Sequence, residues 1–311
     1  MPAPQVSVVL PTRNRSAMLM QALSSALGQE GVRLEVLVID EGSSDDTPER
    51  LERIEDERLS VLRHDRPKGV APARNAAISR ARGEWIAFLD DDDLWAPQNL
   101  RTQLAGAAEE GHSISYCRRI EIDARGFVMN VSHPTRAGDL ARQLLSNNVI
   151  GGPSGVLVRA DLLARVGAFD ERLSALADWD LWIRAAAAGT AGACSEPLVA
   201  YRHHPQNMMT TDASAIMAEF ELLREKHREA AERAGVEFGA AWLTRWRAAR
   251  DLAAGRRLSA AGAFFRSGVR LRDRRDLARA VGALGGGLLQ RIGRTAERRI
   301  TARPDWLDRY A

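Results

Sequence analysis

Apolar residues in the first 112 positions form short runs that alternate with segments of helical pattern. Four runs have the length of buried strands, at residues 6–10, 34–39, 59–62 and 85–89. Helices are predicted between them at residues 16–27, from 47 onward, at 72–82 and at 97–111. Strands that show little polar alternation and are separated by helices indicate a parallel sheet covered on both faces.

The pattern changes beyond residue 112. We expect strands at 114–122, 127–131, 155–158 and 199–202, and helices at 140–145 and 178–188. From about residue 213 helical spacing dominates, with a break at Gly285–Gly287. This organisation predicts a first domain over residues 1–210, with halves 1–112 and 113–210, and a helical C-terminal region over 211–311.

Ligands of such sheets bind beyond the carboxyl ends of the strands, so the residues that follow each strand matter most. Pro11-Thr12-Arg13-Asn14-Arg15 follows the first strand, Asp40-Glu41 the second and Asp90-Asp91-Asp92-Asp93 the fourth. The first strand is not followed by G-x-G-x-x-G, and G-x-x-x-x-G-K-[ST] is absent, which argues against NAD, FAD and P-loop ATP chemistry.

Two acidic clusters at one edge of a sheet predict a negatively charged cleft. Burying even one uncompensated carboxylate is costly, and a divalent cation with oxygen ligands is its natural neutraliser. Taken alone, each feature has a plainer interpretation: a solvated loop for Asp90–Asp93, a turn residue for Asp40, and an exposed helix face for Arg74 and Asn75. Their joint arrangement at successive strand ends favours a site.

Six segments follow one another in a specific order. They match P-T/S-x-N-R, V-x-D-D-G-S-x-D-x-T, G-x-x-x-A-R-N, G-E-x-I-x-F-L-D-x-D-D, G-x-F-D-E and an acidic-D-W-D-L-W-x-R helix, at residues 11–15, 38–47, 69–75, 83–93, 167–171 and 177–184. In this order they make residues 5–205 resemble a family-2 glycosyltransferase. The resemblance implies an α/β GT-A fold, a Rossmann-like mixed sheet flanked by helices, here with a C-terminal α-helical extension.

The resemblance also implies a nucleotide-diphospho-sugar donor, most simply a UDP-sugar. Asp40 and Glu41 would face the base and ribose, Arg74 the base or diphosphate, and Asp90 the ribose. The other implied contacts in the nucleotide-sugar pocket are Pro11, Thr12, Arg13, Asn14 and Asp91.

A divalent metal, Mn²⁺ or Mg²⁺, is implied at the D-x-D pattern, with Asp92 as a direct ligand and His204 as a further candidate. Asp178 matches the general base of an inverting enzyme, which takes a proton from the acceptor hydroxyl. The plainer interpretation of Asp178 is an acidic first-turn residue that stabilises the helix dipole. Asp180 is the alternative base, and Arg184 a structural partner.

Three positions depart from the family pattern: Arg13 replaces an aromatic residue, Glu41 an aspartate, and Ala177 an acidic residue. Glu41 makes uracil preference less secure, so thymine and guanine stay open. Ala177 and Glu41 leave a non-catalytic sugar-nucleotide binding protein as an alternative, and the acidic cleft leaves a nucleotidyltransferase. Acceptors of four kinds stay open: lipid-linked saccharide, polysaccharide, peptide and small molecule.

The formal net charge of +3 conceals two opposite parts. Residues 236–311 hold 17 arginines against 7 acidic residues, so +10, which leaves −7 for residues 1–235. Trp242, Trp246, Phe264 and Phe265 predict a packing lid or a homodimer contact in this basic region. Alternatively, Phe264, Phe265, Val269 and Leu271 near Arg266, Arg270, Arg272, Arg274 and Arg275 predict contact with an anionic membrane surface. Nucleic acid is disfavoured, because the acidic body would oppose it.

The two cysteines, Cys117 and Cys194, form no framework and predict a reducing compartment. The sequence holds no run of 18 apolar residues, and its first residues show no signal-peptide pattern. We therefore expect a cytoplasmic enzyme, with a peripheral position on the inner face of the membrane as the alternative.

Overall fold

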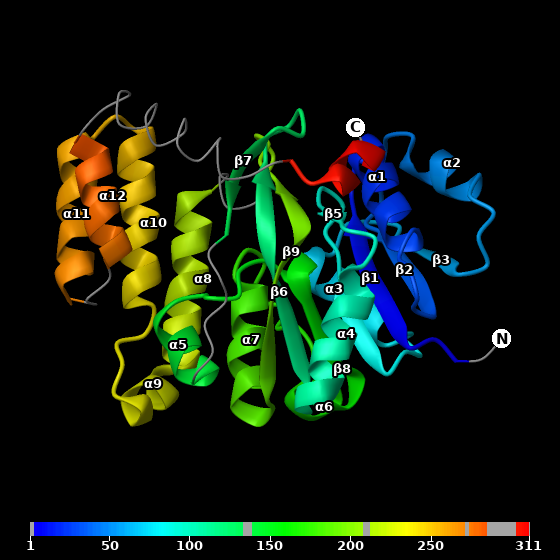
Figure 1. Ribbon diagram of the computed structural model, residues 1–311, viewed down its shortest axis with the longest axis horizontal. Helices are drawn as coiled ribbons and strands as arrows, with labels where there is room; N and C mark the ends of the chain where they lie inside the picture. Colours follow the sequence, from blue (N-terminus) through cyan, green and yellow to red (C-terminus); the bar gives the residue numbers. More distant parts are fainter. Residues whose placement is uncertain (1–2, 133–138, 208–211, 271–273, 285–302, 311) are drawn as a thin grey trace. The chain divides into compact units, whose positions relative to one another are not determined.

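The computed structural model describes residues 3–132, 139–207, 212–270, 274–284 and 303–310 (Figure 1). It divides the chain into two compact units. The first comprises Met1–Ala141, Ile150–Glu221 and Arg303–Ala311, and the second comprises Arg142–Val149 and Leu222–Ala302. This division differs from the expected boundary near residue 210 in three places. The described residues 212–221 belong to the first unit, and two further segments change units. Residues 142–149 join the helical unit, where Leu145 O accepts a bond from Gly239 N at 2.8 Å, and residues 303–311 join the first unit, where Leu307 is buried.

The first unit is built on a mixed sheet of nine strands within the described residues. The strands are β1 (Val6–Thr12), β2 (Leu34–Asp40), β3 (Leu59–Arg63), β4 (Trp85–Phe88), β5 (Leu94–Trp95), β6 (Ile114–Ile122), β7 (Val128–Val131), β8 (Val156–Arg159) and β9 (Ala191–Arg202). Their order across the sheet is β3-β2-β1-β4-β8-β6-β9-β5, with β7 beside β6. Strands β1 to β4 are parallel, whereas β8 runs antiparallel to both β4 and β6.

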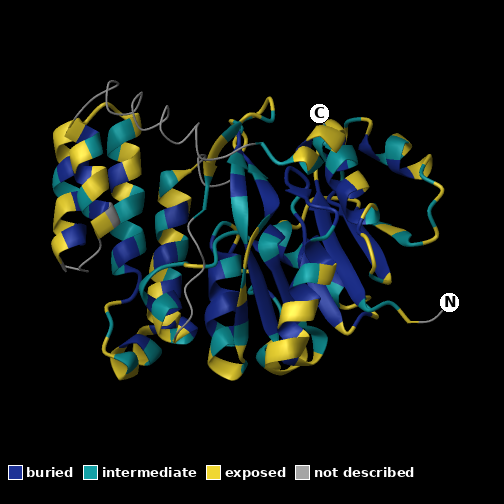
Figure 2. Cartoon of the chain, viewed as in Figure 1, coloured by how far each residue is buried: buried dark blue, intermediate teal, exposed yellow. Residues whose placement is uncertain are grey.

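Helices flank this sheet (Figure 1). They are α1 (Ser16–Leu27), α2 (Thr47–Glu52), α3 (Val70–Ile78), α4 (Asn99–Glu110), α6 (Ala160–Val166) and α7 (Ala177–Ala188). Two further helices, α5 (Leu140–Ser146) and α8 (Ala213–Lys226), begin in the first unit and end in the second. Every residue of β1 and β2 is buried, which Figure 2 shows as dark blue strands, so the unbroken apolar runs are the centre of the sheet. β3 lies at the edge of the sheet, and none of its five residues is buried.

The strands expected in residues 1–112 are confirmed within two residues at each end, and the strand expected at 199–202 forms the end of β9. Two elements, β5 and α6, were missed. β5 has only two residues, and α6 follows β8 directly. β9 has twelve residues, whereas four were expected. The sequence did not predict its first half, because that half is rich in small and polar residues. The pairing of β9 with β6 also shifts register near Arg118. The strand therefore shows no regular alternation of buried and exposed residues that the sequence could reveal.

The second unit is helical in its described part. It contains α9 (Arg228–Ala234), α10 (Ala240–Ala253), α11 (Arg257–Arg270) and α12 (Arg274–Leu284). Phe264 is buried among alanines of α10, α11 and α12, and a Cβ at Gly268 would meet Leu277 at 2.7 Å, so glycine permits the close approach of α11 and α12. No helix among the described residues has the length and apolar character of a membrane span. Gly285–Gly287, Leu271 and Arg272 lie outside the described residues, as do the side chains of Arg270 and Arg275.

Candidate active site

The loops after β1, β2 and β4 meet at one edge of the parallel sheet. Thr12 pairs with Asp40 across β1 and β2, and Val9 pairs with Phe88 across β1 and β4, which brings the three strand ends together. These loops and the N-terminal end of α7 line a cavity of about 390 Å³. Nine of the expected site residues line it: Pro11, Thr12, Arg13, Glu41, Arg74, Asp90, Asp91, Asp92 and Asp178.

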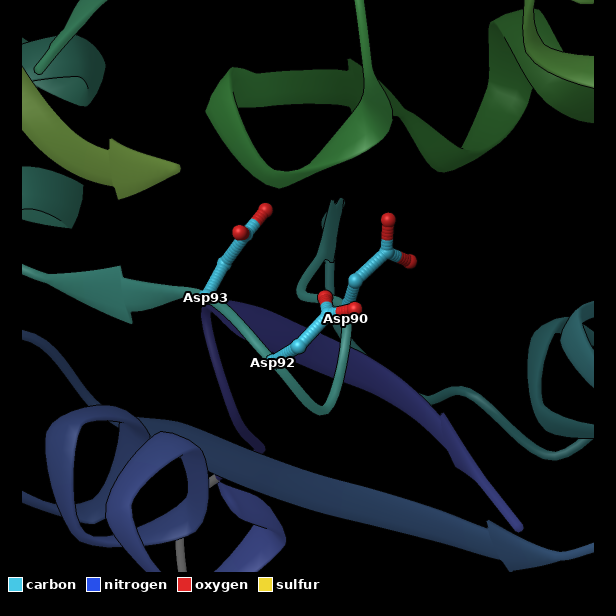
Figure 3. A group of neighbouring side chains, drawn as sticks. All are labelled: Asp90, Asp92 and Asp93. Atoms are coloured by element: carbon cyan, nitrogen blue, oxygen red, sulfur yellow. The ribbon is translucent and has the colours of Figure 1, made fainter. Parts of the chain in front are cut away.

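Two carboxylates that line this cavity, those of Asp90 and Asp92, cluster with the neighbouring Asp93. Asp90, Asp92 and Asp93 each offer an oxygen, and these oxygens lie within 4.8 Å of one another. Figure 3 shows their side chains leaving one tight loop, which joins β4 to β5. Because the β4 end is pinned beside β1 and β5 beside β9, this short loop cannot spread its acidic residues apart.

Arginines from three different elements surround this loop. Arg15 NH1 donates to Asp91 Oδ1 at 3.0 Å and to Asp92 Oδ2 at 2.8 Å. Arg74 NH2 donates to Asp90 Oδ1 at 2.5 Å, and its guanidinium lies 5.2 Å from the centre of the Phe169 ring. The loop is therefore a network of paired charges before any ligand is added.

Arg202, at the end of β9, holds the backbone of the same loop. Its Nε donates to Asp92 O at 3.1 Å, and its backbone N–H donates to Asp93 Oδ1 at 3.1 Å. Its NH2 donates to Gln21 Oε1 at 2.7 Å, and Gln21 Nε2 donates to Tyr310 O at 3.1 Å. A continuous hydrogen-bonded path thus links the C-terminal segment 303–310 to the acidic loop.

Burial and mutual repulsion shift the protonation of the loop. Burial raises the pKa of Asp90, although the Arg74 charge opposes the shift. Burial and the neighbouring Asp92 raise the pKa of Asp91 to about 7, and the same two causes raise the pKa of Asp93 well above its usual range. Raised pKa values of this kind are typical of buried, crowded carboxylates and cluster at functional sites.

Asp178 lies at the first turn of α7 and faces the same cavity. Its Oδ1 accepts a bond from Trp179 N at 2.6 Å. Burial raises the pKa of Asp178 to about 7, against the opposing charge of Arg74. Asp180 is different: it is fully buried, its Oδ2 accepts from Arg184 Nε at 2.8 Å, and it does not line the cavity.

Glu41 lines the cavity, but the protein already binds both of its oxygens. His64 Nδ1 contacts Oε1, while the backbone N–H groups of Lys68 and Gly69 donate to Oε2 at 2.6 and 2.7 Å. Gly69 has φ +106°, a conformation that glycine adopts without strain, and it is the residue directly before α3. The longer side chain of glutamate therefore holds the loop before α3 at the cavity wall.

Asp40 and Asn14 do not line the cavity. Asp40 is buried, its Oδ1 accepts from Ser43 N at 2.9 Å, and within the described residues its Oδ2 accepts no hydrogen bond. Asn14 adopts φ +53°, and its Oδ1 accepts from Ser44 N at 2.7 Å. Asn14 therefore ties the loop after β1 to the loop after β2, whereas Asp40 stabilises the turn that follows its own strand. A direct ligand contact by either residue stays a prediction.

The two neighbouring histidines face different carboxylates. His204 Nε2 lies 2.8 Å from Asp92 Oδ2, and Gln206 N donates to His204 Nδ1 at 3.2 Å, which places the ring proton on Nε2 of the neutral imidazole. His203 Nε2 lies 3.5 Å from Glu121 Oε2 and is half-exposed. His204 is therefore the histidine beside the acidic loop, although it does not line the cavity.

The oxygen donors of this loop fit a hard divalent cation such as Mg²⁺ or Mn²⁺. Asp93 fits less well than its neighbours, because its two oxygens already accept bonds from Ser154 Oγ and Arg202 N. In the described part of the chain, Oδ2 of Asp90 and Oδ1 of Asp92 accept no hydrogen bond, which leaves one oxygen on each for a cation.

Sequence reasoning missed Arg15, Tyr201 and Asn207, which line the cavity, and Arg202, which supports it. Arg15 belongs to the P-T-x-N-R segment, so its place beside the first strand end was a usable signal. Tyr201 and Arg202 end a strand whose pairing only the structure reveals. Asn207 Nδ2 donates to Arg202 O at 3.1 Å, and the local sequence gives no sign of this contact.

Comparisons with known proteins agree with this fold and site. Residues 7–167 match the model of Glycosyl transferase family 2. The chain is 34% identical over 213 residues to the succinoglycan biosynthesis protein ExoO of Rhizobium meliloti, an alignment that covers 65% of this chain and 61% of that protein. It is 36% identical over 111 residues to the Escherichia coli UDP-Glc:alpha-D-GlcNAc-diphosphoundecaprenol beta-1,3-glucosyltransferase WfgD, covering 36% and 44% of the two chains.

Solved structures show the same fold at low sequence identity. TarS 1–349 of S. aureus in complex with UDP-GlcNAc superposes with a TM-score of 0.61 at 20% identity, covering 73% of this chain and 66% of that one. The family match covers more than half of the 311 residues, so the chain belongs to glycosyl transferase family 2 and its first unit has the GT-A fold. The chain spans about three fifths of ExoO and less than half of WfgD.

Proposed function

We propose that this protein is an inverting glycosyltransferase that moves a sugar from a nucleotide-diphospho-sugar to an acceptor hydroxyl. One observation carries the proposal: a carboxylate with a pKa of about 7, Asp178, shares a cavity with the acidic loop Asp90–Asp92. A base poised near neutral pH and a diphosphate-binding edge are the two parts that this reaction requires.

Asp178 is the proposed general base. Its carboxylate accepts the proton of the acceptor hydroxyl while that oxygen bonds to the anomeric carbon of the sugar. The bond between this carbon and the diphosphate oxygen breaks, and its electron pair leaves with the nucleoside diphosphate. Attack from the face opposite the leaving group inverts the anomeric configuration.

Asp90 and Asp92 would hold a Mg²⁺ or Mn²⁺ ion, and His204, whose Nε2–H donates to Asp92 Oδ2, would orient the Asp92 carboxylate toward it. When bound, the ion neutralises charge on the departing diphosphate. Arg15 and Arg74 both line the cavity and would bind the diphosphate oxygens as the acidic loop takes the cation. Thr12 and Arg13 would line the nucleotide side.

The donor is proposed to be a UDP-sugar, carrying a hexose or an N-acetylhexosamine. The TarS complexes with UDP and UDP-GlcNAc, on the same fold, support this choice. The acceptor is proposed to be a saccharide hydroxyl, and the named roles of ExoO and WfgD in glycan synthesis favour a growing polysaccharide or a lipid-linked sugar. With such an acceptor, the proposed location of the enzyme is the cytoplasmic face of a membrane.

The test is nucleotide release from UDP-, GDP- and dTDP-sugars with Mn²⁺ or Mg²⁺, comparing the parent with Asp178→Asn and Asp92→Asn. Asp161→Asn is the matched control, because Asp161 occupies the same first-turn position of α6 but points to solvent beside Arg159 and Arg165. We expect both site variants to lose activity by at least about 100-fold and the control to keep it. Equal turnover by Asp178→Asn and the parent would refute the proposal. Donor-induced thermal stabilisation without turnover of any acceptor would identify a sugar-nucleotide binding protein instead.

A further inference from the structure

An apolar ridge crosses the outer surface of α11 and α12 in the second unit. It consists of Leu258, Phe265 and Val269 on α11 and of Val281 and Leu284 on α12, which are between 58% and 80% exposed. These five residues form more than half of the large exposed hydrophobic side chains in the described chain. Within the described residues of the unit, nothing covers this ridge.

The ridge follows from helix geometry and is not a set of scattered residues. Leu258, Phe265 and Val269 are spaced by seven and four residues, which places them on one side of α11. Phe264 lies on a different side and is buried in the core between the helices. The sequence assigned Phe264 and Phe265 to one surface, and the structure separates them.

The two helices bring their parts of the ridge together at a close crossing. Gly268 of α11 lies directly against Leu277 of α12. Val269 follows Gly268, and Val281 lies one helical turn after Leu277. Val269 and Val281 therefore border the same crossing, and the other ridge residues continue along their helices away from it.

Positive charge surrounds the ridge. The sequences of α11 and α12 contain six arginines and one acidic residue, Asp276. Asp276 is fully buried and accepts bonds from Arg245 Nε at 3.0 Å, Ser267 Oγ at 2.6 Å and Arg279 NH1 at 2.6 Å. Arg266 and Arg274 are exposed. The surface of these helices thus presents apolar and cationic groups without a carboxylate among the described side chains.

We propose that this ridge binds the surface of an anionic phospholipid bilayer. Leu, Phe and Val side chains on one face of a helix insert at the boundary of headgroups and acyl chains, and flanking arginines contact lipid phosphates. A second copy of the ridge is a poorer occupant, because it would bring two cationic surfaces together. Membrane binding by the ridge does not depend on glycosyl transfer, so either proposal can fail without the other.

Vesicle flotation of the full chain tests the proposal. Phosphatidylcholine vesicles with and without phosphatidylglycerol are compared for the parent and for two double variants, Phe265→Ser/Val269→Ser and Arg266→Gln/Arg274→Gln. Phe127→Ser is the matched control, because Phe127 is 63% exposed in the turn of the first unit that joins β6 to β7. Circular dichroism confirms that each variant is folded.

We expect the parent and Phe127→Ser to float with the anionic vesicles only, and increasing salt to weaken their recovery. Each ridge variant should lose at least about tenfold in partitioning. Recovery of a folded ridge variant equal to that of the parent, or failure of the parent to float, would overturn the proposal. So would a parent dimer that the Phe265→Ser/Val269→Ser variant converts to a monomer in light scattering, since the ridge would then be a protein interface.

Discussion

Arginine has opposite uses in the two units. In the first unit Arg15, Arg74 and Arg202 converge on one acidic loop and bind its carboxylates and backbone. In α11 and α12 one buried aspartate takes bonds from Arg245 and Arg279, and other arginines of these helices are exposed. The difference teaches that net charge alone does not identify a binding surface: the acidic unit neutralises its charges internally, whereas the basic unit displays them.

The largest expected effect is removal of a cavity arginine. Arg74→Met leaves Asp90 without its 2.5 Å partner beside two other carboxylates. Uncompensated charge at this position should weaken diphosphate binding, and we expect kcat/KM for donor turnover to fall about 100-fold, or ~2.7 kcal/mol. Steady-state kinetics with a UDP-sugar measures this loss.

Arg279→Met is the matched change in the second unit. Arg279 also donates to a buried aspartate, but Asp276 retains bonds from Arg245 and Ser267. We expect kcat/KM to stay within about twofold of the parent. A similar loss in both variants would erase the proposed contrast between the units.

The next effect is the pH dependence of catalysis. Burial raises the pKa of Asp178 to about 7, so the carboxyl is protonated, and unable to act as a base, below that pH. We expect kcat to rise about tenfold per pH unit below pH 7 and to level off above it. Burial also raises the pKa of Asp91 to about 7, so the residual activity of Asp178→Asn decides the assignment. A rising limb that persists unchanged in this variant would contradict the role of Asp178.

Much of the parallel half of the sheet was predictable from sequence. The apolar runs of β1 and β2 have no polar interruption because both faces are buried, and this is the pattern that local reasoning interprets best. The long β9 was not predictable, because its pairing with β6 crosses two register shifts and gives no period of two. The return of residues 303–310 to the first unit depends on Leu307, whose partners Ile120 and Ala200 are distant in sequence.

The candidate site also contains residues that the sequence predicts and contacts that only the structure shows. Residues that directly follow a strand, such as Thr12 and Asp92, were predictable because parallel strand ends meet at one edge. The sequence could not reveal that Glu41 binds the loop before α3, since the partners are backbone N–H groups 27 and 28 residues away. Nor could it reveal that Arg202 supports the acidic loop from the other half of the sheet.

A smaller effect concerns stability. Because the folded state raises the pKa of Asp178, it binds this proton more tightly than the unfolded chain, and the parent loses stability as pH rises from about 4 to about 7. Asp178→Asn carries no charge and avoids this loss. We expect its free energy of unfolding to exceed that of the parent by on the order of 2 kcal/mol at pH 8 and to match it near pH 4. Urea denaturation at both pH values measures the difference.

Asp161→Asn should change stability in the opposite direction. Hydrogen bonding by Arg159 lowers the pKa of Asp161, so its contribution is present above pH 4 and lost on acidification. A small destabilisation at pH 8 is therefore expected. If both variants stabilised the protein equally, burial could not explain the behaviour of Asp178, because Asp161 is exposed.

The smallest expected effect is that of replacing Arg266, an arginine beside the ridge. Arg266 is exposed on α11, beside a face that makes no contact with the core of the unit, so its guanidinium interacts mainly with water. We expect Arg266→Gln to change the free energy of unfolding by less than about 0.5 kcal/mol and to leave donor turnover unchanged. Urea denaturation and kinetics in the absence of lipid measure both quantities. A loss of 2 kcal/mol or more is about the cost of breaking a buried charged hydrogen bond. Such a loss would mean that Arg266, like Arg74, makes a stabilising contact within the protein. The two units would then not differ in how they use arginine.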